Sequence, residues 1–215
     1  VLSAMDLDGA PTLLASMRDL TDRKLYEAKI HQLAFYDALT GLPNRRLFFD
    51  RLAQAVAQSR RSGRHGAVIY LDLDNFKPVN DRHGHRAGDL LLQEAARRLA
   101  HCLREEDTVA RLGGDEFILI QEDVDSPDVV EQVARKVLEA FAPRFPVAPP
   151  QGLFVSVSIG LALYPMDGLT PDELLMRADL AMYRAKEAGR NGIEFFTPGM
   201  DSLGDERLSL EYALR

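Results

Sequence analysis

Hydrophobic and polar residues alternate along the chain with a period that changes between extended and helical several times. Residues 67–73 and 153–163 are mostly apolar runs, a pattern that predicts buried strands. Residues 108–112 and 117–120 are short β-rich runs on either side of a Gly-Gly pair, so they predict a hairpin. A last apolar run at residues 193–196 predicts one more strand.

Helical periodicity fills the stretches between these strands, with start signals at Ser126-Pro127 and at the capping box that opens with Thr170. The expected helices run from Asn44 to Arg61, from Ala87 to Leu103 with Leu90, Leu91, Ala95, Leu99 and Leu103 facing inward, from Ser126 to Phe141 and from Thr170 to Ala188. This order predicts an α/β domain whose mixed, largely antiparallel sheet of about five strands is flanked by helices. It is not a doubly wound Rossmann fold, because no Gly-rich phosphate loop follows the first strand.

A charged segment with a narrow apolar stripe precedes this domain. Thr21 or Asp22 is expected to cap a helix there. Its stripe comprises Leu25, Ile30, Leu33 and Ala34. A helix of this kind in front of a domain usually connects or dimerises rather than catalyses.

Composition narrows the class of protein. The 215 residues, 46% of them hydrophobic, suffice for one domain with a full core. A balance of 26 Lys and Arg against 33 Asp and Glu gives a net charge of -7, which argues against nucleic acid as a partner. The single cysteine, Cys102, predicts a buried structural thiol and a reducing, cytoplasmic location. No apolar stretch is long enough to cross a bilayer, so we expect no direct membrane contact from these residues.

Two pairs of acids are candidates for chemistry. Asp72 and Asp74 end an otherwise apolar strand, where carboxylates are costly unless a cation or hydrogen bonds hold them. Asp115 and Glu116 stand at the tip of the predicted hairpin, beside two glycines that leave room for a ligand. Together these oxygens predict a Mg²⁺ site bound with phosphates. For either pair alone, the alternative to a metal site is that the acids are ordinary solvated residues of a turn.

The run Gly113-Gly114-Asp115-Glu116-Phe117 does not stand alone. Around it lie Asp72-Leu73-Asp74-Asn75-Phe76-Lys77, Asn80-Asp81, Gly84-His85 and Gly88-Asp89, an opening turn from Asp37 to Arg45, and a closing helix with Ala178, Asp179, Tyr183, Lys186, Gly189, Arg190 and Asn191. In these motifs the chain resembles the GGDEF family of diguanylate cyclases over Asp37 to Phe196. The resemblance implies the nucleotidyl cyclase fold, related to a polymerase palm.

The resemblance also implies roles for individual residues. Mg²⁺, with Mn²⁺ as a substitute, would bind Asp72, Asp115 and the backbone carbonyl of Leu73. Asp115, with Glu116 beside it, would be the candidate base at the reacting 3′-hydroxyl of GTP. The remaining substrate contacts would be Asn80 and Asp89 at the guanine edge, His85 near the same nucleotide, and Lys77, Lys186 and Arg190 at the triphosphate. Lys186 and Arg190 are four apart, so on one helix they would share a face.

The same resemblance suggests regulation and neighbouring domains. Five residues separate Asp107 from the Gly-Gly pair. Arg104 and Asp107 therefore fall where the family binds cyclic di-GMP as an inhibitor. Residues 1–20 resemble the end of a PAS-like sensor domain, followed by a signalling helix at 21–36. The catalytic domain is expected at 37–197, and residues 198–215 resemble a linker towards an EAL-like phosphodiesterase domain.

Several alternatives stay open at this point. His83 and His85 resemble a zinc pair but lack a nearby third ligand. Asn80 and Asp89 could cap helices, and Arg104 and Asp107 could form a surface ion pair. For the whole chain, the leading expectation is a cyclase that acts as a homodimer, because the product is two-fold symmetric and the chain has one set of site residues. The alternatives are a catalytically weak GTP-binding domain that regulates an EAL domain and a receptor for cyclic di-GMP.

Overall fold

The computed structural model describes residues 2–7, 10–15, 29–147 and 151–200. The chain divides into two compact units, Val1–Ala34 and Phe35–Arg215. The first unit contains an antiparallel pair of strands that the hydrophobic pattern had not predicted, β1 (Leu2–Leu7) and β2 (Ala10–Ala15). Residues 29–35 are helical, but the predicted caps at Thr21 and Asp22 lie outside the described residues, as does the segment 201–215.

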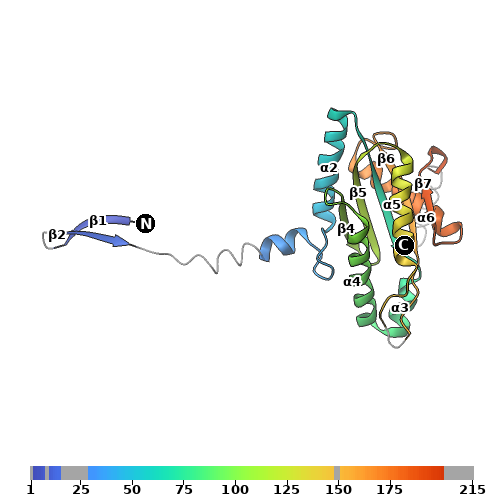
Figure 1. The fold of residues 1–215 in the computed structure, drawn as a ribbon, viewed down its shortest axis with the longest axis horizontal. Coiled ribbons are helices and arrows are strands. Elements are labelled where there is room, and N and C mark those ends of the chain that lie inside the picture. Colours follow the sequence, from blue (N-terminus) through green and yellow to red (C-terminus); the bar gives the residue numbers. More distant parts are fainter. Residues whose placement is uncertain (1, 8–9, 16–28, 148–150, 201–215) are drawn as a thin grey trace, which may run out of the picture. The chain divides into compact units, whose positions relative to one another are not determined.

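A five-stranded sheet forms the centre of the second unit, in the order β4-β5-β3-β6-β7 (Figure 1). Its neighbours pair antiparallel except β6 and β7, which are parallel. This confirms the predicted mixed, largely antiparallel sheet. The strands are β3 (His65–Leu73), β4 (Thr108–Gly113), β5 (Glu116–Val124), β6 (Val157–Tyr164) and β7 (Ile193–Phe195).

Helices cover both faces of the sheet. On one face α4 (His85–Cys102) and α5 (Pro127–Phe141) pack over β3 residues such as Ile69 and Leu71. On the other face α2 (Arg45–Ser62) and α6 (Pro171–Glu187) pack over Val68 and Tyr70. Burial on both faces explains why β3 is an unbroken apolar run instead of an alternating one.

Local signals place two of these helices where the sequence predicted them. The side chain of Asn44 accepts a hydrogen bond from the Leu47 N–H at 3.1 Å and caps α2. At α6, Thr170 and Glu173 form the reciprocal capping box. Gly160 of β6 is equally important, since a Cβ there would lie 2.1 Å from the Ala178 carbonyl oxygen of α6. Only glycine lets α6 lie this close to the sheet.

Three details differ from the expectations. A short helix, α3 (Phe76–His83), connects β3 to α4 and was not among the predicted helices. Leu90 is 47% exposed, so its predicted inward orientation is wrong, because successive helix positions face different directions and here Leu91 and Leu92 face the core. The strand predicted from residue 153 begins only at Val157, since Leu153 forms an isolated bridge with Phe145 instead.

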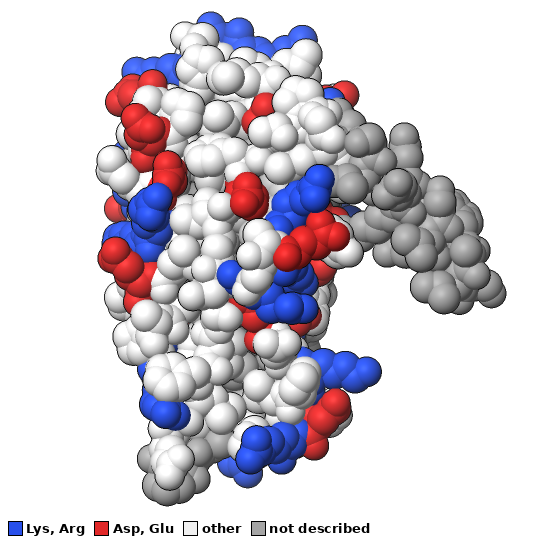
Figure 2. Space-filling model, turned by 90° about the vertical axis from the view of Figure 1, so that its right-hand side faces the viewer, with Lys and Arg blue, Asp and Glu red and all other residues white. Residues whose placement is uncertain are grey.

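The surface carries charges of both signs. On the face shown in Figure 2, Lys and Arg side chains are interspersed with Asp and Glu. The predicted buried thiol of Cys102 is confirmed, and burial raises its pKa. Within the part of the chain that the structure describes, none of the helices is long and apolar enough to span a membrane.

Candidate active site

The end of β3 places polar side chains in a row across the middle of the sheet. Asp72 is the cross-strand partner of Glu116 on β5 and of Ser158 on β6. Because side chains at paired positions share a face, these three lie on the α6 side. Asp72 is only 9% exposed, and the Lys186 Nζ of α6 lies 2.8 Å from its Oδ1. Two predicted site residues more than a hundred positions apart are therefore in direct contact.

Around Asp72 the negative charges outnumber the positive ones. Burial raises the pKa of Asp72 to about 6, and the negative charges of Asp115 and Glu116 add to the rise, although Lys186 opposes it. Neighbouring carboxylates repel one another, which raises their pKa, and a bound cation would reduce this repulsion. Lys186 already supplies one positive charge to Asp72.

The donor set is chemically suited to Mg²⁺. Two carboxylates and the Leu73 carbonyl are hard oxygen donors, and Mg²⁺ sites commonly take one or two carboxylates and complete the shell with phosphates and water. Within the described residues no three His, Cys, Asp or Glu side chains form a metal cluster by themselves. A Mg²⁺ at Asp72 and Asp115 would therefore need the backbone oxygen and the substrate to complete its coordination.

The Gly-Gly turn positions Asp115. Gly113 and Gly114 have φ of 149° and 50°, values that L side chains rarely adopt. The turn folds back on β3, where the Leu73 N–H donates to the Asp115 carbonyl at 3.3 Å. Asp72, Leu73 and Asp115, which the family resemblance grouped at the metal, thus lie at one strand end.

Arg111 anchors this turn and was missed from the sequence. Its Nε and Nη2 donate to the Gly114 carbonyl at 3.1 and 2.7 Å. Its Nη1 lies 3.0 and 3.1 Å from the two carboxylate oxygens of Asp37. Burial would raise the pKa of Asp37, but hydrogen bonds from Thr40 and the pairing with Arg111 bring it below its usual value. The opening turn is therefore tied directly to the hairpin that carries Asp115.

Tyr70 is a second residue that the sequence did not indicate. It lies two positions before Asp72 on the same face of β3 and is 6% exposed. Burial raises the pKa of Tyr70, and the charges of Glu116 and Asp179 together with a hydrogen bond to Glu116 raise it further. Tyr70 is therefore a buried, neutral hydroxyl group beside Glu116.

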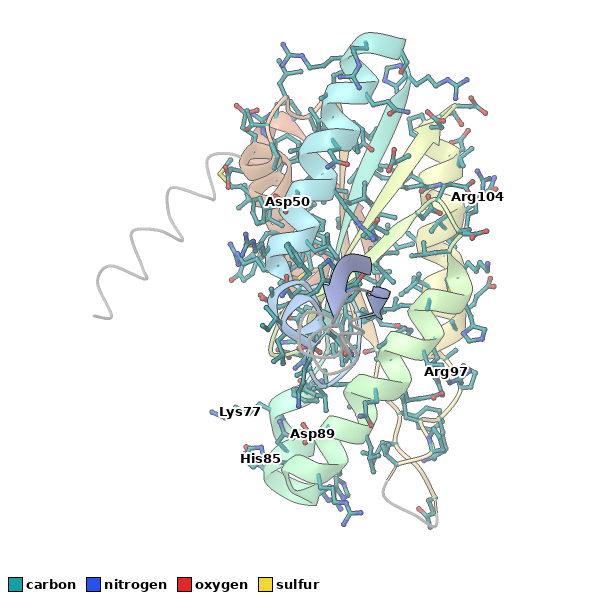
Figure 3. All side chains as sticks on the ribbon, turned by 90° about the vertical axis from the view of Figure 1, so that its left-hand side faces the viewer. Asp50, Lys77, His85, Asp89, Arg97 and Arg104 are labelled. Carbon is teal, nitrogen blue, oxygen red and sulfur yellow. The ribbon has the colours of Figure 1, made fainter. Side chains whose placement is uncertain are left out.

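Helices α3 and α4 form the second part of the site. Asn80 packs against Gly88, where a Cβ would meet its Oδ1 at 1.9 Å, so only glycine fits between the helices. Asp89 follows on α4, and Lys77, His85 and Asp89 lie near one another and are exposed (Figure 3). The capping alternative for Asn80 and Asp89 is wrong, because the cap positions of α3 and α4 are Asn75 and Gly84.

The pair of basic residues predicted to bind phosphate, Lys186 and Arg190, has a different geometry from the expected one. Helix α6 ends at Glu187, and Arg190 lies beyond it with a left-handed φ of 65°. The expectation that Lys186 and Arg190 share a face of one helix is therefore wrong. Lys186 reaches the site from the helix, whereas the exposed Arg190 lies in the turn that follows it.

The predicted inhibitory pair lies away from this site. Asp107 Oδ2 accepts a hydrogen bond from the backbone N–H of Arg104 at 3.1 Å, and burial raises the pKa of Asp107. The Arg104 side chain is exposed beyond the C-terminal end of α4 (Figure 3). Since Asp89 is near the start of that helix, the helix axis separates the two regions by about 20 Å.

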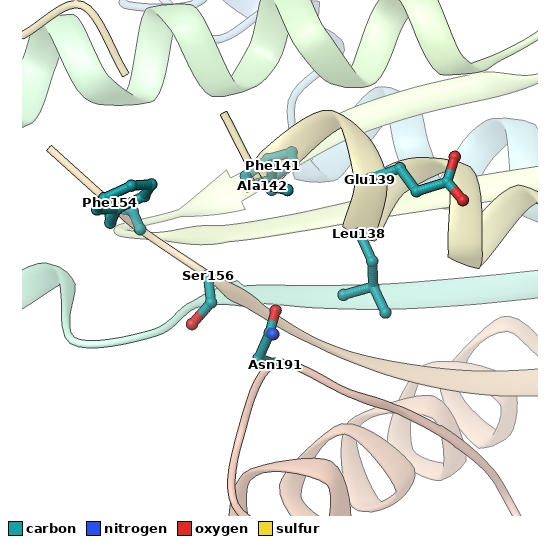
Figure 4. A pocket seen from close by; sticks show the side chains of 8 residues that line it. Leu138, Glu139, Phe141, Ala142, Phe154, Ser156 and Asn191 are labelled. Atoms are coloured by element: carbon teal, nitrogen blue, oxygen red, sulfur yellow. The ribbon is translucent and has the colours of Figure 1, made fainter. Parts of the chain in front are cut away.

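A cleft of about 530 Å³ opens beside α5 and the chain that enters β6 (Figure 4). Its walls include Phe141 and Phe154, and Ser156 and Asn191 line it as well. None of the residues that line it is a predicted site residue. Its connection with the site runs through Asp74, which accepts hydrogen bonds from both Ser156 and Asn191.

Comparison with known proteins agrees with this arrangement. The family model described as "Diguanylate cyclase, GGDEF domain" matches residues 34–192. The bifunctional diguanylate cyclase/cyclic di-GMP phosphodiesterase MucR of Pseudomonas aeruginosa is 43% identical over 221 residues, covering 100% of this chain and 31% of MucR. The chain therefore spans about a third of the length of this relative.

Solved structures show the same fold. The isolated GGDEF domain of TpbB from Pseudomonas aeruginosa is 36% identical with a TM-score of 0.77, covering 79% of this chain and 99% of that one. The coiled coil and GGDEF domain of DgcB from Caulobacter crescentus, in complex with c-di-GMP, is 26% identical with a TM-score of 0.73, covering 82% of this chain and 93% of that one. The strand-end acids, the hairpin that carries them and the family match together show that this chain belongs to the GGDEF diguanylate cyclase family.

Proposed function

We propose that the chain is a diguanylate cyclase that condenses two GTP into cyclic di-GMP and two pyrophosphates. The observation that carries the proposal is the group of acids around the end of β3, where burial and the charges of Asp115 and Glu116 raise the pKa of Asp72 to about 6 in spite of Lys186. Such an uncompensated charge group is typical of sites that bind a metal and phosphates.

Asp72, Asp115 and the Leu73 carbonyl would hold Mg²⁺. When bound, the metal would neutralise phosphate charge and lower the pKa of the attacking hydroxyl. Lys186, which pairs with Asp72 in the structure, would contact the triphosphate together with Lys77 and Arg190. The Asp89 carboxylate would accept from the N–H groups of guanine, Asn80 would bind the same edge of the base, and His85 would lie beside them.

Each 3′-hydroxyl oxygen would attack the α-phosphorus of the other GTP, and the bond to the pyrophosphate would break. The hydroxyl proton would pass to a carboxylate, for which Asp115 is the candidate base and Glu116 its neighbour. One chain offers one set of these residues, so two protomers would face each other with one GTP each. Cyclic di-GMP would also bind Arg104 and Asp107 and inhibit the enzyme.

The runner-up is a domain that binds GTP with little turnover and controls a phosphodiesterase domain. It is favoured by MucR, whose name includes both activities and of which this chain covers 31%. Incubating the purified chain with GTP and Mg²⁺ distinguishes the two. Cyclic di-GMP and pyrophosphate in a 1:2 ratio support the cyclase, whereas GTP that binds and stays intact supports the regulatory domain. Matched reactions with ATP or without Mg²⁺ should yield no product.

A further inference from the structure

Asp74 differs from Asp72 although both end the same strand. Asp74 is 4% exposed, and both of its carboxylate oxygens are hydrogen-bonded. Oδ1 accepts from the Ser158 hydroxyl at 2.7 Å, and Oδ2 accepts from the Ser156 hydroxyl at 2.7 Å and the Asn191 N–H at 3.1 Å. Three of about four acceptor positions on a carboxylate are thereby used. Hydrogen bonds therefore account for its burial without a cation.

These bonds join three segments that are far apart in the sequence. The Asp74 N–H donates to the Ser156 carbonyl at 2.9 Å, which closes a second bond between the exit of β3 and the entrance of β6. The bond from Asn191 adds the turn after α6, 117 residues away. Asp74 therefore connects the strand end that carries Asp72 and Leu73 with the turn that carries Arg190.

That turn has an unusual backbone. Gly189, Arg190 and Asn191 have φ of 122°, 65° and 47°, so two successive residues with side chains are left-handed. Asparagine tolerates this region, but for arginine it is unfavourable, and surrounding contacts must maintain it. On the helix side the Arg190 N–H donates to the Ala185 carbonyl at 3.0 Å. On the sheet side the Asp74 carboxylate holds the Asn191 N–H, and the Gly192 carbonyl accepts from the Ile159 N–H at 2.9 Å.

We propose that Asp74 is a positioning residue for phosphate binding: by holding the Asn191 N–H, it fixes the left-handed turn that directs Arg190 to the triphosphate. The inference rests on the proposed function, which gives Arg190 its ligand. It assigns different tasks to two neighbouring acids, since Asp72 faces the cationic groups of the site while Asp74 faces hydroxyl and amide donors.

The direct test is a double-mutant cycle on binding of a non-hydrolysable GTP analogue with Mg²⁺. Asp74→Ala and Arg190→Ala should each weaken binding about tenfold, and the double variant should bind no more weakly than either single variant. Guanosine, which lacks phosphates, should bind all variants as it binds the parent chain. Independent losses that multiply in the double variant, or an equal loss for guanosine, would overturn the proposal.

Conservative variants separate positioning from simple damage. Asp74→Asn keeps an acceptor for Asn191 and should restore most of the affinity that Asp74→Ala loses. Ser158→Ala replaces Asp74→Ala if that variant does not fold. It removes one hydroxyl donor to Asp74 at a position with no expected ligand contact, and it should weaken binding of the GTP analogue about twofold to fivefold. In Asp74→Ala, the Mg²⁺ concentration for half-maximal binding should stay at the parent value. A shift as large as that of Asp72→Ala would make Asp74 a metal ligand instead.

One readout does not depend on nucleotide binding. The Asn191 amide should exchange slowly with deuterium in the parent chain and at least tenfold faster in Asp74→Ala, while amides in the middle of β3 keep their protection. Unprotected Asn191 in the parent chain would refute the inference by itself. If the amide behaves as expected but the parent binds no GTP analogue, the proposed function fails while the contact from Asp74 to the turn stands.

Discussion

The two ends of the central sheet both gather acids that are partly or fully buried, but they stabilise them in different ways. At one end, which we call the nucleotide end, Asp72 lies near Asp115 and Glu116, and burial together with their charges raises its pKa to about 6. At the far end, burial also raises the pKa of Asp107 and Glu122. Burial alone therefore does not distinguish a site from a structural acid.

The partners distinguish the two ends. At the nucleotide end, the partner of Asp72 is Lys186 from a distant helix, and the Arg111 guanidinium connects the hairpin to the opening turn. At the far end, Asp107 accepts from an N–H three residues away, and Arg64 pairs with Asp123 while both are largely exposed. Arg64 and Asp123 are 59 positions apart, so sequence distance alone does not separate the two ends. Charged groups that distant elements bury at one point are characteristic of a functional site, whereas a neighbouring backbone donor and a solvated ion pair are characteristic of a structural end.

The largest effect should follow from removing an acid at the nucleotide end. Asp115→Ala should lower the production of cyclic di-GMP by about 10²- to 10³-fold or more, because it deletes both a metal ligand and the candidate base. The fold should remain, since Asp115 is at a hairpin tip. Product formation is measured by chromatography and folding by thermal melting. Asp125→Ala, an exposed acid just after β5, is the control and should keep full activity.

A smaller effect is expected at α3 and α4, which contribute exposed side chains to the same end. Asn80→Ala and Asp89→Ala should each weaken GTP binding by about 1–3 kcal/mol, because the base N–H groups lose their acceptors. Titration at fixed Mg²⁺ measures the loss, and Asp81→Ala on the exposed face of α3 is the control. Parent-like affinity for both variants would place the guanine elsewhere and restrict the site to the strand end.

Much of the fold was predictable because it depends on local periodicity. The continuous apolar run predicts β3, the Gly-Gly turn predicts the hairpin of β4 and β5, and start signals at Ser126 and Thr170 predict where two helices begin. Helix α3 was missed, since its eight residues include Pro78, and its apolar stripe is only Phe76 and Val79, too short to show a period. The turn at Arg190 was misassigned to a helix although Gly189 is a typical helix-ending residue.

The site was predictable only in part, for a physical reason. Motifs name residue types, but the contacts that distinguish Asp72 from Asp74 come from elements far along the chain, such as Lys186 and Ser158. Arg111 and Asp37 are 74 positions apart, and no periodicity relates them. Gly160 offered a usable signal, because an isolated glycine in an apolar strand often marks close approach of another backbone.

A third prediction concerns regulation at the far end. Arg104→Ala should leave the initial rate of turnover at the parent value and weaken inhibition by cyclic di-GMP at least tenfold, about 1.4 kcal/mol. The exposed guanidinium is free of the metal region, so only the inhibitory ligand should lose a contact. Arg97→Ala, an exposed arginine on α4 that pairs with Glu94, is the control. Parent-like inhibition of Arg104→Ala would reduce Arg104 and Asp107 to a structural helix end.

A fourth prediction separates the two ends by stability alone, through two arginines that each pair with an aspartate, and it includes the smallest effect expected. Arg64 and Asp123 have side chains 65% and 50% exposed, so solvent and salt screen their attraction, and Arg64→Ala should cost less than about 0.5 kcal/mol. Arg111 and Asp37 are 11% and 22% exposed, and Arg111→Ala should cost about 2–3 kcal/mol because Asp37 and the Gly114 carbonyl lose their donor. Urea unfolding measures both free energies. Equal losses would show that the arginine at the nucleotide end stabilises the fold no more than a solvated surface pair does.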